Sequence, residues 1–466
     1  MDLRSLAAVD LAKAIRDRKL TSLEATTAAI ARLKPVHELC NAVVAFEDDD
    51  ALSFARAIDA SLTRGDDPGA LAGVPLAHKD MFDRAGKIPS WGARIRLDKP
   101  CARDATLIHR LKAAGSVQIA ALHLTEFAFG PTGHNYVLGH CRNPWDPTRI
   151  TGGSSSGSAV CVAAGVVPAA LGSDTGGSLR LPAAACGIAS IKPTWSRVTR
   201  AGAMPLSPSL DTVGALARDV RDLAAMMTIL AGHDPLDPTS SHRSVPDYQQ
   251  EMSQPVQGLR IGIDDALIGE AHTEVQQAIE SSLQQLEKAG AKRVKVRLKD
   301  FAVLDHLMQI LQLTEVASSH GPYLRRRAEE IGPQVRARIE YGHFISGADY
   351  QTALRARGTI LARVLSETYA DADMTILPVL ADPLPTIADL DVAGGPKLLA
   401  AMARVVKYTR PINYLGLPTI TLPVPRTGGL PNGFQLVGRP FAEGRLLAIG
   451  RAYQRIVPPE VATRLA

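Results

Sequence analysis

Two serines that could act as nucleophiles lie in neighbouring loops, separated by a short apolar segment. Ser154 lies in a serine run bounded by glycines, and Ser178 ends the sequence Asp-Thr-Gly-Gly-Ser. Neither is accompanied by an adjacent histidine that would activate it. Lys79, which lies among apolar neighbours at the end of a predicted strand, is the candidate base. A lysine serves as a base only when neutral, so burial or positive neighbours must lower its pKa from about 10.4.

The loop that contains Ser178 has the composition of an oxyanion site. Its two glycines let the backbone approach a substrate closely, and the loop is predicted to open a helix, whose first turn has unpaired N–H groups. Ser178 could attack a carbonyl carbon while these groups hold the oxyanion, each donor contributing roughly 3 kcal/mol. Ser154 could then relay the proton to Lys79. The predicted donors are the N–H groups of Thr175, Gly176, Gly177 and Ser178.

Local patterns place these loops between alternating helices and strands. Residues 104–114 have helical spacing, Gly115 ends that helix, and residues 116–122 follow as a strand. After the serine run, a short helix is predicted over 158–164 and a buried strand over 166–171. This alternation predicts an α/β protein with a layered sheet.

The same alternation continues farther along the chain. Strands are predicted at 258–263, 293–298 and 374–379. Basic and apolar residues alternate over 293–298, which is typical of the exposed side of an edge strand protected by charge. A surface helix is predicted over 274–289, with Thr273 and Gln276 as its capping box and Gly290 at its end.

The two serine-containing motifs resemble those of the amidase signature family. Residues 152–158 read Gly-Gly-Ser-Ser-Ser-Gly-Ser and differ from the family motif at Ser156, where glycine is commoner. Residues 174–182 match the second motif, with Leu179 in place of isoleucine. Further family segments precede Lys79 and recur near the end of the chain, so the resemblance covers nearly all of it.

This resemblance implies a catalytic set of a serine nucleophile, a bridging serine after a cis peptide bond, and a lysine. Ser178 is accordingly the acyl-enzyme nucleophile, Ser154 the bridging serine and Lys79 the base. Gly130, Ser155 and Phe129 are the candidate substrate-binding residues. Aromatic side chains near the entrance would suit an apolar acyl or aryl group, although core packing explains them equally well.

The resemblance also implies the fold and its organisation. We expect a single amidase signature domain over residues 1–466, with a central mixed β-sheet covered by helices. The catalytic core motifs span 71–190, and residues 216–398 form the variable region where substrate selectivity resides. No cofactor or metal is implied, and ordinary hydrogen bonding is the expected role of histidines such as His78, His134 and His140.

The expected activity is hydrolysis of a small-molecule carboxamide to a carboxylate and ammonia or an amine. The alternative is the glutamine-hydrolysing A subunit of a tRNA-dependent amidotransferase, which works within a complex. Arg338 could match the arginine that such subunits use for the glutamine carboxylate. Against this alternative, residues 405–408 lack the acidic residue that binds the amino group, and the tyrosine-rich helix after the arginine is reduced to 349–351. A non-catalytic binding module is disfavoured because every motif position is occupied.

Three other chemistries fit short motifs but not their context. Gly-x-Ser-x-Gly would make Ser155 the nucleophile of an α/β-hydrolase, but His343 is the last histidine and is badly placed for that triad. Asp174 begins an Asp-Thr-Gly triplet, but an aspartic protease needs two and the chain has no second one. Gly157 is not followed by the Lys and Ser or Thr of a phosphate-binding loop.

Composition is consistent with a cytoplasmic enzyme. The 466 residues are 46% hydrophobic, enough for a large core, and the net charge of +5 does not call for a nucleic-acid partner. Five scattered cysteines without metal-type spacing favour a reducing compartment. The N-terminus lacks an uninterrupted apolar secretion signal, and the longest apolar run, 159–171, is shorter than the about 20 residues that span a bilayer. No membrane partner is expected, and a homodimer is the candidate assembly.

Overall fold

A mixed β-sheet forms the centre of the molecule. The computed structural model describes residues 2–95, 99–391, 395–426 and 429–462. The strands are β1 (Val43–Phe46), β2 (Pro75–Lys79), β3 (Val117–Leu122), β4 (Ala169–Asp174), β5 (Ala189–Lys192), β6 (Thr212–Ala217), β7 (Arg260–Ile263), β8 (Lys292–Lys295), β9 (Met374–Pro378), β10 (Thr419–Pro423) and β11 (Gly433–Gly438). Within the described residues they form one sheet of eleven strands in the order β1-β3-β2-β4-β6-β5-β10-β11-β9-β7-β8.

Helices surround this sheet. The α-helices are α1 (Ala8–Arg16), α2 (Ser22–Cys40), α3 (Asp48–Arg64), α4 (Thr106–Ala113), α5 (Ser156–Ala163), α6 (Arg180–Cys186), α7 (Val220–Leu230), α8 (Tyr248–Glu251), α9 (Asp265–Ile268), α10 (Thr273–Lys288), α11 (Phe301–Arg327), α12 (Pro333–Gly342), α13 (Gly347–Glu367), α14 (Gly395–Val406), α15 (Arg410–Leu415) and α16 (Glu443–Gln454). Short 3₁₀ turns are η1 (Glu126–Ala128), η2 (Ala328–Glu330) and η3 (Ala388–Leu390).

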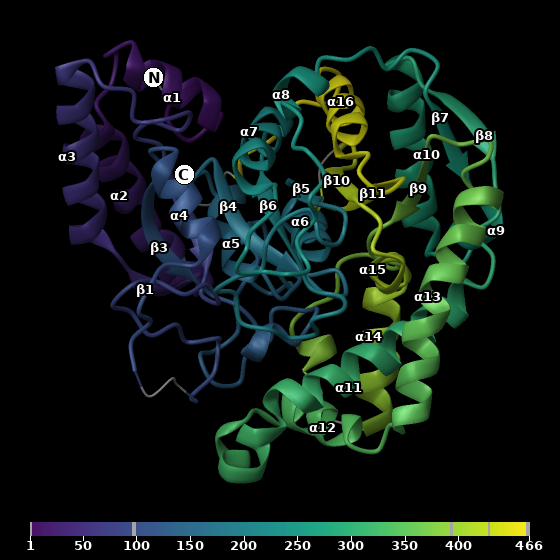
Figure 1. Ribbon diagram of the computed structural model, residues 1–466. Helices are drawn as coiled ribbons and strands as arrows, with labels where there is room; N and C mark the ends of the chain where they lie inside the picture. Colours follow the sequence, from purple (N-terminus) through teal and green to yellow (C-terminus); the bar gives the residue numbers. More distant parts are fainter. Residues whose placement is uncertain (1, 96–98, 392–394, 427–428, 463–466) are drawn as a thin grey trace.

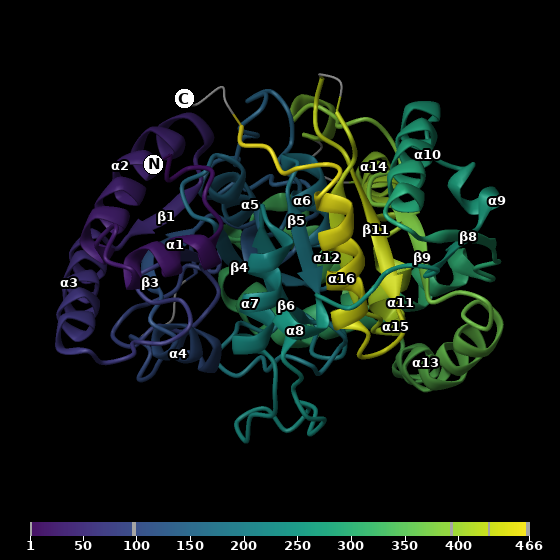
Figure 2. The ribbon, with the colours of Figure 1, turned by 90° about the horizontal axis from the view of Figure 1, so that it is seen from above.

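The sheet combines parallel and antiparallel pairs. β2 pairs in parallel with β3 and β4, and β7 pairs in parallel with β8 and β9. The central strands β4, β6, β5, β10, β11 and β9 pair antiparallel in that order. Figure 2 shows α1 to α3 at one end of the sheet and β8 with α10 at the other. This arrangement confirms the predicted α/β fold with a central mixed sheet covered by helices.

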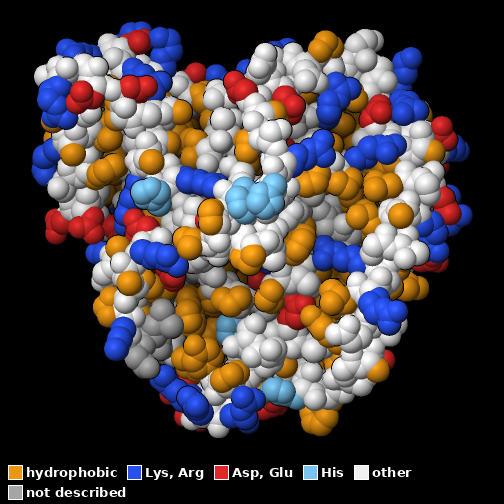
Figure 3. All heavy atoms as spheres, in the orientation of Figure 1, with side chains coloured by type: hydrophobic (Ala, Val, Ile, Leu, Met, Phe, Trp, Pro, Cys, Tyr) orange, Lys and Arg blue, Asp and Glu red, His pale blue; other side chains and the backbone are white. Residues whose placement is uncertain are grey.

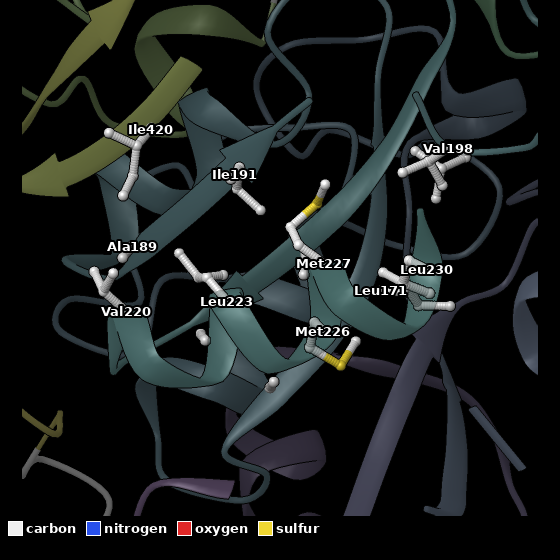
Figure 4. Packing of buried hydrophobic residues seen from close by; sticks show 14 of the residues in the cluster. Leu171, Ala189, Ile191, Val198, Val220, Leu223, Met226, Met227, Leu230 and Ile420 are labelled. Carbon is white, nitrogen blue, oxygen red and sulfur yellow. The ribbon is translucent and has the colours of Figure 1, made fainter. Parts of the chain in front are cut away.

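Each face of the sheet has its own apolar core. Residues of α2, α3, α5 and α6 pack in one cluster, and residues of α1, α4, α7, α10 and α16 pack in another. Figure 4 shows the second core close by, where α7 carries Leu223 and Met227 toward β-strand residues that include Ile191 and Ile420. All of these side chains are removed from solvent, so burial of apolar area holds α7 on the sheet.

The third group of helices lies beside the sheet. Figure 1 shows α11 to α15 gathered in the lower right of the view, apart from α1 to α5. A separate apolar cluster joins α11, α13 and α15 to β9 and β11. α11 to α13 belong to the region expected to vary with substrate, and α11, α12, α14 and α15 carry residues that line a small cavity next to Ser178.

Several predicted elements are confirmed, with shifted ends. The helix predicted over 104–114 is α4, and the strand predicted over 293–298 is the shorter β8, which lies at an edge of the sheet with Lys292 and Lys295 exposed. The strand predicted over 166–171 is β4, which begins at Ala169 because Pro168 has no N–H for a ladder bond.

The predicted capping box of α10 is wrong. His272 is the N-cap residue, and its ring nitrogen accepts a hydrogen bond from the Glu274 N–H at 3.3 Å. Gln276 instead donates its side-chain amide to the carbonyl oxygen of Ala271 at 2.8 Å. A ring nitrogen that replaces a hydroxyl as the cap acceptor cannot be recognised from the Ser/Thr pattern.

The surface carries charges of both signs. Figure 3 shows Lys and Arg side chains interspersed with Asp and Glu on the face drawn, as the net charge of +5 leads one to expect. Among the described residues, no helix has both the length and the hydropathy needed to span a bilayer. The five cysteines are free, and Cys40, Cys141, Cys161 and Cys186 are buried.

Candidate active site

Lys79 and Ser154 form the first contact of the predicted catalytic set. The Lys79 Nζ lies 2.6 Å from the Ser154 Oγ and 2.8 Å from the Ser173 Oγ. β2 ends at Lys79, as predicted, and its parallel neighbour β4 supplies Ser173. All three side chains are buried, so the lysine is held between two hydroxyls without a carboxylate in direct contact among the described residues.

The serine run lies directly before α5. The peptide bond between Gly153 and Ser154 is cis, as the family resemblance implies. A Cβ at Gly153 would lie 2.6 Å from the Gly130 carbonyl oxygen, so a side chain there would collide with the neighbouring loop. The Ser155 N–H donates to the Ser178 carbonyl oxygen at 3.4 Å, which joins the two serine loops next to Ser154.

The Ser178 loop is anchored by a buried ion pair. Arg180 and Asp174 lie 3.0 Å apart, and both side chains are fully buried. Arg180 also donates to the Gln435 Oε1 at 2.8 Å and to the Asn413 side-chain oxygen, while Asn413 donates to Asp174 at 2.8 Å. Burial raises the pKa of Asp174, but Arg180 more than offsets this and holds it well below its usual range. The loop is therefore fixed by a satisfied polar network.

Backbone N–H groups of this loop differ in their availability. The Gly177 N–H donates to the Asp174 Oδ1 at 2.8 Å, so one of the four predicted oxyanion donors already has an acceptor. In the described part of the chain the N–H groups of Thr175, Gly176 and Ser178 have no hydrogen-bond acceptor. Gly177 has a φ of +128°, and a Cβ there would lie 2.6 Å from the Thr409 Oγ1, so this position requires glycine.

The pKa of Lys79 is lowered by burial. Burial lowers this pKa to about 7, against the opposing charges of Asp211 and Asp174. Asp211 accepts a hydrogen bond from the Thr175 Oγ1 at 2.5 Å and from the N–H groups of Leu206 and Ser207. Burial raises the pKa of Asp211 to about 6 despite these bonds. Near neutral pH a large fraction of Lys79 is thus uncharged and able to accept a proton.

Ser178 borders a small cavity, which we call the inner cavity. It has a volume of about 20 Å³, room for about one water molecule. Phe129 and Gly130 line it with Ser178, whereas Ser155 does not; the Ser155 hydroxyl donates to the Ser173 carbonyl oxygen at 3.2 Å. The lining residues are Ala128, Phe129, Gly130, Pro131, Gly176, Ser178, Leu181, Gln312, Arg338, Val406 and Arg410.

Ser178, the predicted nucleophile, and Ser154, the predicted bridging serine, lie in neighbouring loops, but no direct hydrogen bond joins their side chains. Ser178 is 8% exposed, enough to face the inner cavity, whereas Ser154 is fully buried. No hydrogen bond joins their hydroxyls among the described residues. The Lys79 to Ser154 half of the predicted relay is therefore in hydrogen-bond contact, and the Ser154 to Ser178 half stays a prediction.

Among the residues that the structure describes, histidines away from Lys79 offer a candidate metal cluster. His134, His140 and Asp391 can bring one ligand atom each to within 4.8 Å of one another. Both ring nitrogens of His134 already have partners, the Thr132 Oγ1 at 2.8 Å and the Ile387 carbonyl oxygen at 2.9 Å. These bonds are consistent with the hydrogen-bonding role expected for His134.

Four site residues were not expected from the sequence: Ser173, Asp211, Gln312 and Arg410. Ser173 directly precedes Asp174 on a strand, so its place near Lys79 follows from the parallel pairing of β2 and β4. Asp211 reaches the site from the loop before β6. Gln312 and Arg410 lie on α11 and α15, in parts of the chain where no motif was recognised.

Comparison with known proteins decides the family. The amidase family model matches residues 24–447. The chain belongs to the amidase family. It is therefore an enzyme of a family that acts on carbon–nitrogen amide bonds, and the amidase signature resemblance is confirmed. The serine–serine–lysine set is typical of this family.

Amidase family relatives cover nearly the whole chain. The A subunit of a glutamyl-tRNA(Gln) amidotransferase from Moorella thermoacetica is 37% identical, and the match covers 98% of this chain and 97% of the relative. Its counterpart from Chloroflexus aurantiacus is 36% identical, with coverage of 94% and 93%.

Solved amidase structures share the fold. A chain from a vestigial protein complex linked to the evolutionary origins of an s-triazine catabolic enzyme has a TM-score of 0.91 and 31% identity, covering 98% of this chain and all of its own. A peptide amidase in complex with chymostatin has a TM-score of 0.86 and 26% identity, with coverage of 97% and 98%.

Proposed function

We propose that this amidase hydrolyses a small carboxamide through an acyl-enzyme on Ser178, with Ser154 and Lys79 relaying protons. The observation that carries the proposal is the buried contact of 2.6 Å between the Lys79 Nζ and the Ser154 Oγ, beside the cavity that Ser178 lines. A buried lysine with a pKa of about 7 can exist as a free base at neutral pH, which a surface lysine cannot.

The reaction follows from this arrangement in two stages. The Ser178 Oγ forms a bond to the carbonyl carbon while its proton passes through Ser154 to Lys79. The carbon–nitrogen bond then breaks, and the same relay returns the proton to the departing nitrogen. In the second stage water attacks the acyl carbon and gives up a proton to the relay. The bond between that carbon and the Ser178 Oγ then breaks, the relay returns the proton to the Oγ, and the carboxylic acid leaves and ionises.

Backbone donors stabilise the charge on the carbonyl oxygen. The N–H groups of Thr175, Gly176 and Ser178 are the available donors, because Gly177 donates to Asp174. Preorganised donors in a site with little water contribute roughly 3 kcal/mol each to the transition state. Gly130 and Phe129 line the same cavity and are proposed to contact the substrate.

Interception of the acyl group tests this function. Purified protein is offered a panel of aliphatic and aryl amides together with hydroxylamine, and both ammonia and hydroxamate are measured. A covalent acyl intermediate predicts hydroxamate formation that a Ser178→Ala variant lacks. Ammonia release that continues unchanged in Ser178→Ala would overturn the proposal.

A second candidate is the glutaminase component of a tRNA-dependent amidotransferase. It is favoured by the 37% identity to such a protein and by the presence of Arg338 at the inner cavity. Another lining residue favours a different substrate. Val406 lines the cavity and belongs to residues 405–408, the segment where an acidic residue was expected to bind the amino group of glutamine. Glutaminase activity that appears only with partner proteins and charged tRNA would favour this candidate.

A further inference from the structure

Gln312 lies on α11 where the inner cavity meets a larger chamber. This outer chamber has a volume of about 300 Å³. Among the residues that the structure describes, Gln312, Arg338 and Arg410 line both spaces. Gln312 is 5% exposed, so its amide lies inside the protein and meets a substrate that extends from the outer chamber to Ser178.

The Gln312 amide has no hydrogen-bond partner in the described part of the chain. Other buried glutamines, Gln118, Gln334, Gln435 and Gln454, each have at least one. A buried amide without a partner is unfavourable compared with an apolar side chain of similar size. Solvent in the cavity can satisfy Gln312 in the free enzyme, but a substrate that displaces this solvent has to supply the missing bonds.

The two arginines beside Gln312 already have partners. Arg338 donates to the Phe129 carbonyl oxygen at 2.9 Å, and its guanidinium carbon lies 3.4 Å from the centre of the Phe129 ring. Arg410 lies 3.8 Å from the Asp305 Oδ1, so a nearby carboxylate opposes its charge. Of the three described residues that line both spaces, Gln312 is therefore the one whose polar group is left for a ligand.

The Gln312 amide is close to the loop that carries Ser178. A Cβ at Gly176 would lie 3.6 Å from the Gln312 Nε2. Gly176 is two residues before Ser178, and its N–H is one of the proposed oxyanion donors. A group that is hydrogen-bonded to Gln312 therefore lies within a short chain length of the carbonyl carbon that Ser178 is proposed to attack.

A glutamine side chain offers both donors and an acceptor. Its Nε2 carries two N–H groups, and its Oε1 accepts. A second amide group matches both atoms, because its oxygen accepts from Nε2 while its N–H donates to Oε1. A carboxylate has no proton for Oε1, and an ammonium group has no acceptor for Nε2, so each would satisfy only half of the side chain.

We infer that Gln312 determines specificity, and that the substrate carries a second, uncharged amide group that pairs with Gln312 while the scissile carboxamide lies at Ser178. This inference rests on the proposed hydrolysis at Ser178 and narrows its substrate class. Leu181 and Val406 line the inner cavity together with Gln312, so an apolar chain is expected between the two amide groups.

Diamides and their apolar isosteres test the inference on the intact protein. Malonamide, succinamide and glutaramide are each compared with the monoamide in which an isopropyl group replaces one carboxamide. Corrected for its two equivalent amide groups, the best diamide is expected to exceed its isostere about tenfold or more in kcat/KM, the effect of leaving a buried amide unpaired. The matching half-amides malonamate, succinamate and glutaramate present a carboxylate instead and should be slower than the diamide.

Substitution of Gln312 shows whether it causes the preference. Gln312→Leu is expected to reduce the diamide-to-isostere ratio of kcat/KM about tenfold, mainly through the KM of the diamide, because leucine is of similar size but forms no hydrogen bond. Gln312→Asn keeps the amide on a side chain one methylene shorter, so the preferred diamide should become one methylene longer. Gln309→Leu is the control, because Gln309 lies on the same helix but already donates to the Asp305 Oδ2 at 2.7 Å. Its ratio should stay near that of wild type.

A fluorophosphonate probe separates this inference from the proposed function. Labelling of Ser178 in wild type and in each variant reports folded protein with a working nucleophile, whatever the substrate. Ser178 labelling combined with equal rates for diamides and isosteres, or with half-amides faster than diamides, would overturn the substrate class alone. A ratio unchanged by Gln312→Leu, or lost equally in Gln309→Leu, would overturn the role of Gln312. Absence of labelling in wild type would overturn the proposed function itself.

Discussion

Lys79 donates a hydrogen bond of 2.6 Å to Ser154 in a fully buried contact. In the proposed mechanism the lysine takes the role that a histidine has in a more familiar serine hydrolase, and its basicity has to come from burial. Ser173, on the parallel neighbour β4, accepts a second hydrogen bond from the same nitrogen at 2.8 Å. The charge state of this one nitrogen should therefore govern how the activity responds to pH and to substitution.

The activity should depend on the loss of a proton from Lys79. Because burial lowers the pKa of Lys79 to about 7, the neutral base is depleted below that pH and dominates above it. We expect kcat/KM for a neutral amide to rise with a slope of one through a midpoint near pH 7. A profile measured from pH 5 to 9 that is flat, or still rises without bending at pH 9, would contradict this.

Asp211 should influence the pH at which kcat/KM rises, the acidic limb of the pH profile. Its negative charge raises the pKa of Lys79, together with that of Asp174, so removing it lowers the lysine pKa further. An Asp211→Asn variant should therefore shift the acidic limb of kcat/KM to lower pH, while its side-chain oxygen can still accept from Thr175.

The control is Asp237→Asn. Asp237 lines a cavity of about 220 Å³ together with Asp211 and Ser173, but does not figure among the charges that act on Lys79. Its replacement should leave the limb in place. A limb shifted equally by both substitutions would indicate a general change of the cavity and would count against a specific effect of Asp211.

Lys79 should matter more for amides than for esters. An amide nitrogen must be protonated as it leaves, whereas an alkoxide or phenolate leaves more readily, so loss of the relay penalises the amide further. A Lys79→Ala variant is expected to lose about 10²-fold more in kcat/KM on an amide than on the matched ester, the size of a general-acid contribution.

Lys192→Met serves as the comparison for that experiment. Lys192 is also a buried lysine with a pKa lowered to about 7, but it donates to the Pro193 carbonyl oxygen and not to Ser154. Its loss should leave the amide-to-ester ratio near that of wild type. Equal losses on amide and ester in Lys79→Ala would refute the proposed division of labour.

Arg180 should stabilise the fold through Asp174. Both side chains are fully buried, so Arg180→Met leaves an uncompensated carboxylate and should cost about 3 to 5 kcal/mol in the free energy of unfolding. Arg180 keeps the pKa of Asp174 low, so this contribution is present above the unfolded carboxyl pKa of about 3.9 and is lost as the pH falls toward the folded value.

Urea unfolding at pH 7 and at about pH 3, below the unfolded carboxyl pKa, measures this effect. The difference between wild type and Arg180→Met should shrink at the lower pH. The double variant Asp174→Asn with Arg180→Met should recover part of the loss, because no buried charge is then left unpaired. A double variant whose loss equals the sum of the two single losses would argue against direct coupling.

The sequence was most informative where a motif is short and local. Lys79 at the end of a strand, and the two serine loops before and after α5, were predicted because glycine and serine patterns act over a few residues. The order of the strands in the sheet could not be predicted, because pairing joins segments far apart, such as β5 with β10. The ends of elements shifted by a few residues for local reasons, such as Pro168 before β4.

The sequence was least informative about residues that reach the site from distant elements. Asp211 contacts Thr175 across 36 positions, and Arg410 meets Gly176 from a helix more than 200 residues later. Neither lies in a recognisable motif, and an arginine outside any motif is normally a solvated side chain. Gly177 shows a different limit of sequence analysis. The composition of its loop predicted that its N–H is an oxyanion donor, but in the structure Asp174 accepts a hydrogen bond from that N–H.

Mapping the site of fluorophosphonate modification tests the central claim most directly. The folded protein is treated with the probe, digested, and analysed by tandem mass spectrometry, with a Ser178→Ala variant and a heat-unfolded sample beside it. We predict a single adduct on Ser178 that is absent from both controls. An adduct on Ser154 or Ser155 in the folded protein, or none where a known serine hydrolase is modified in the same tube, would contradict the account.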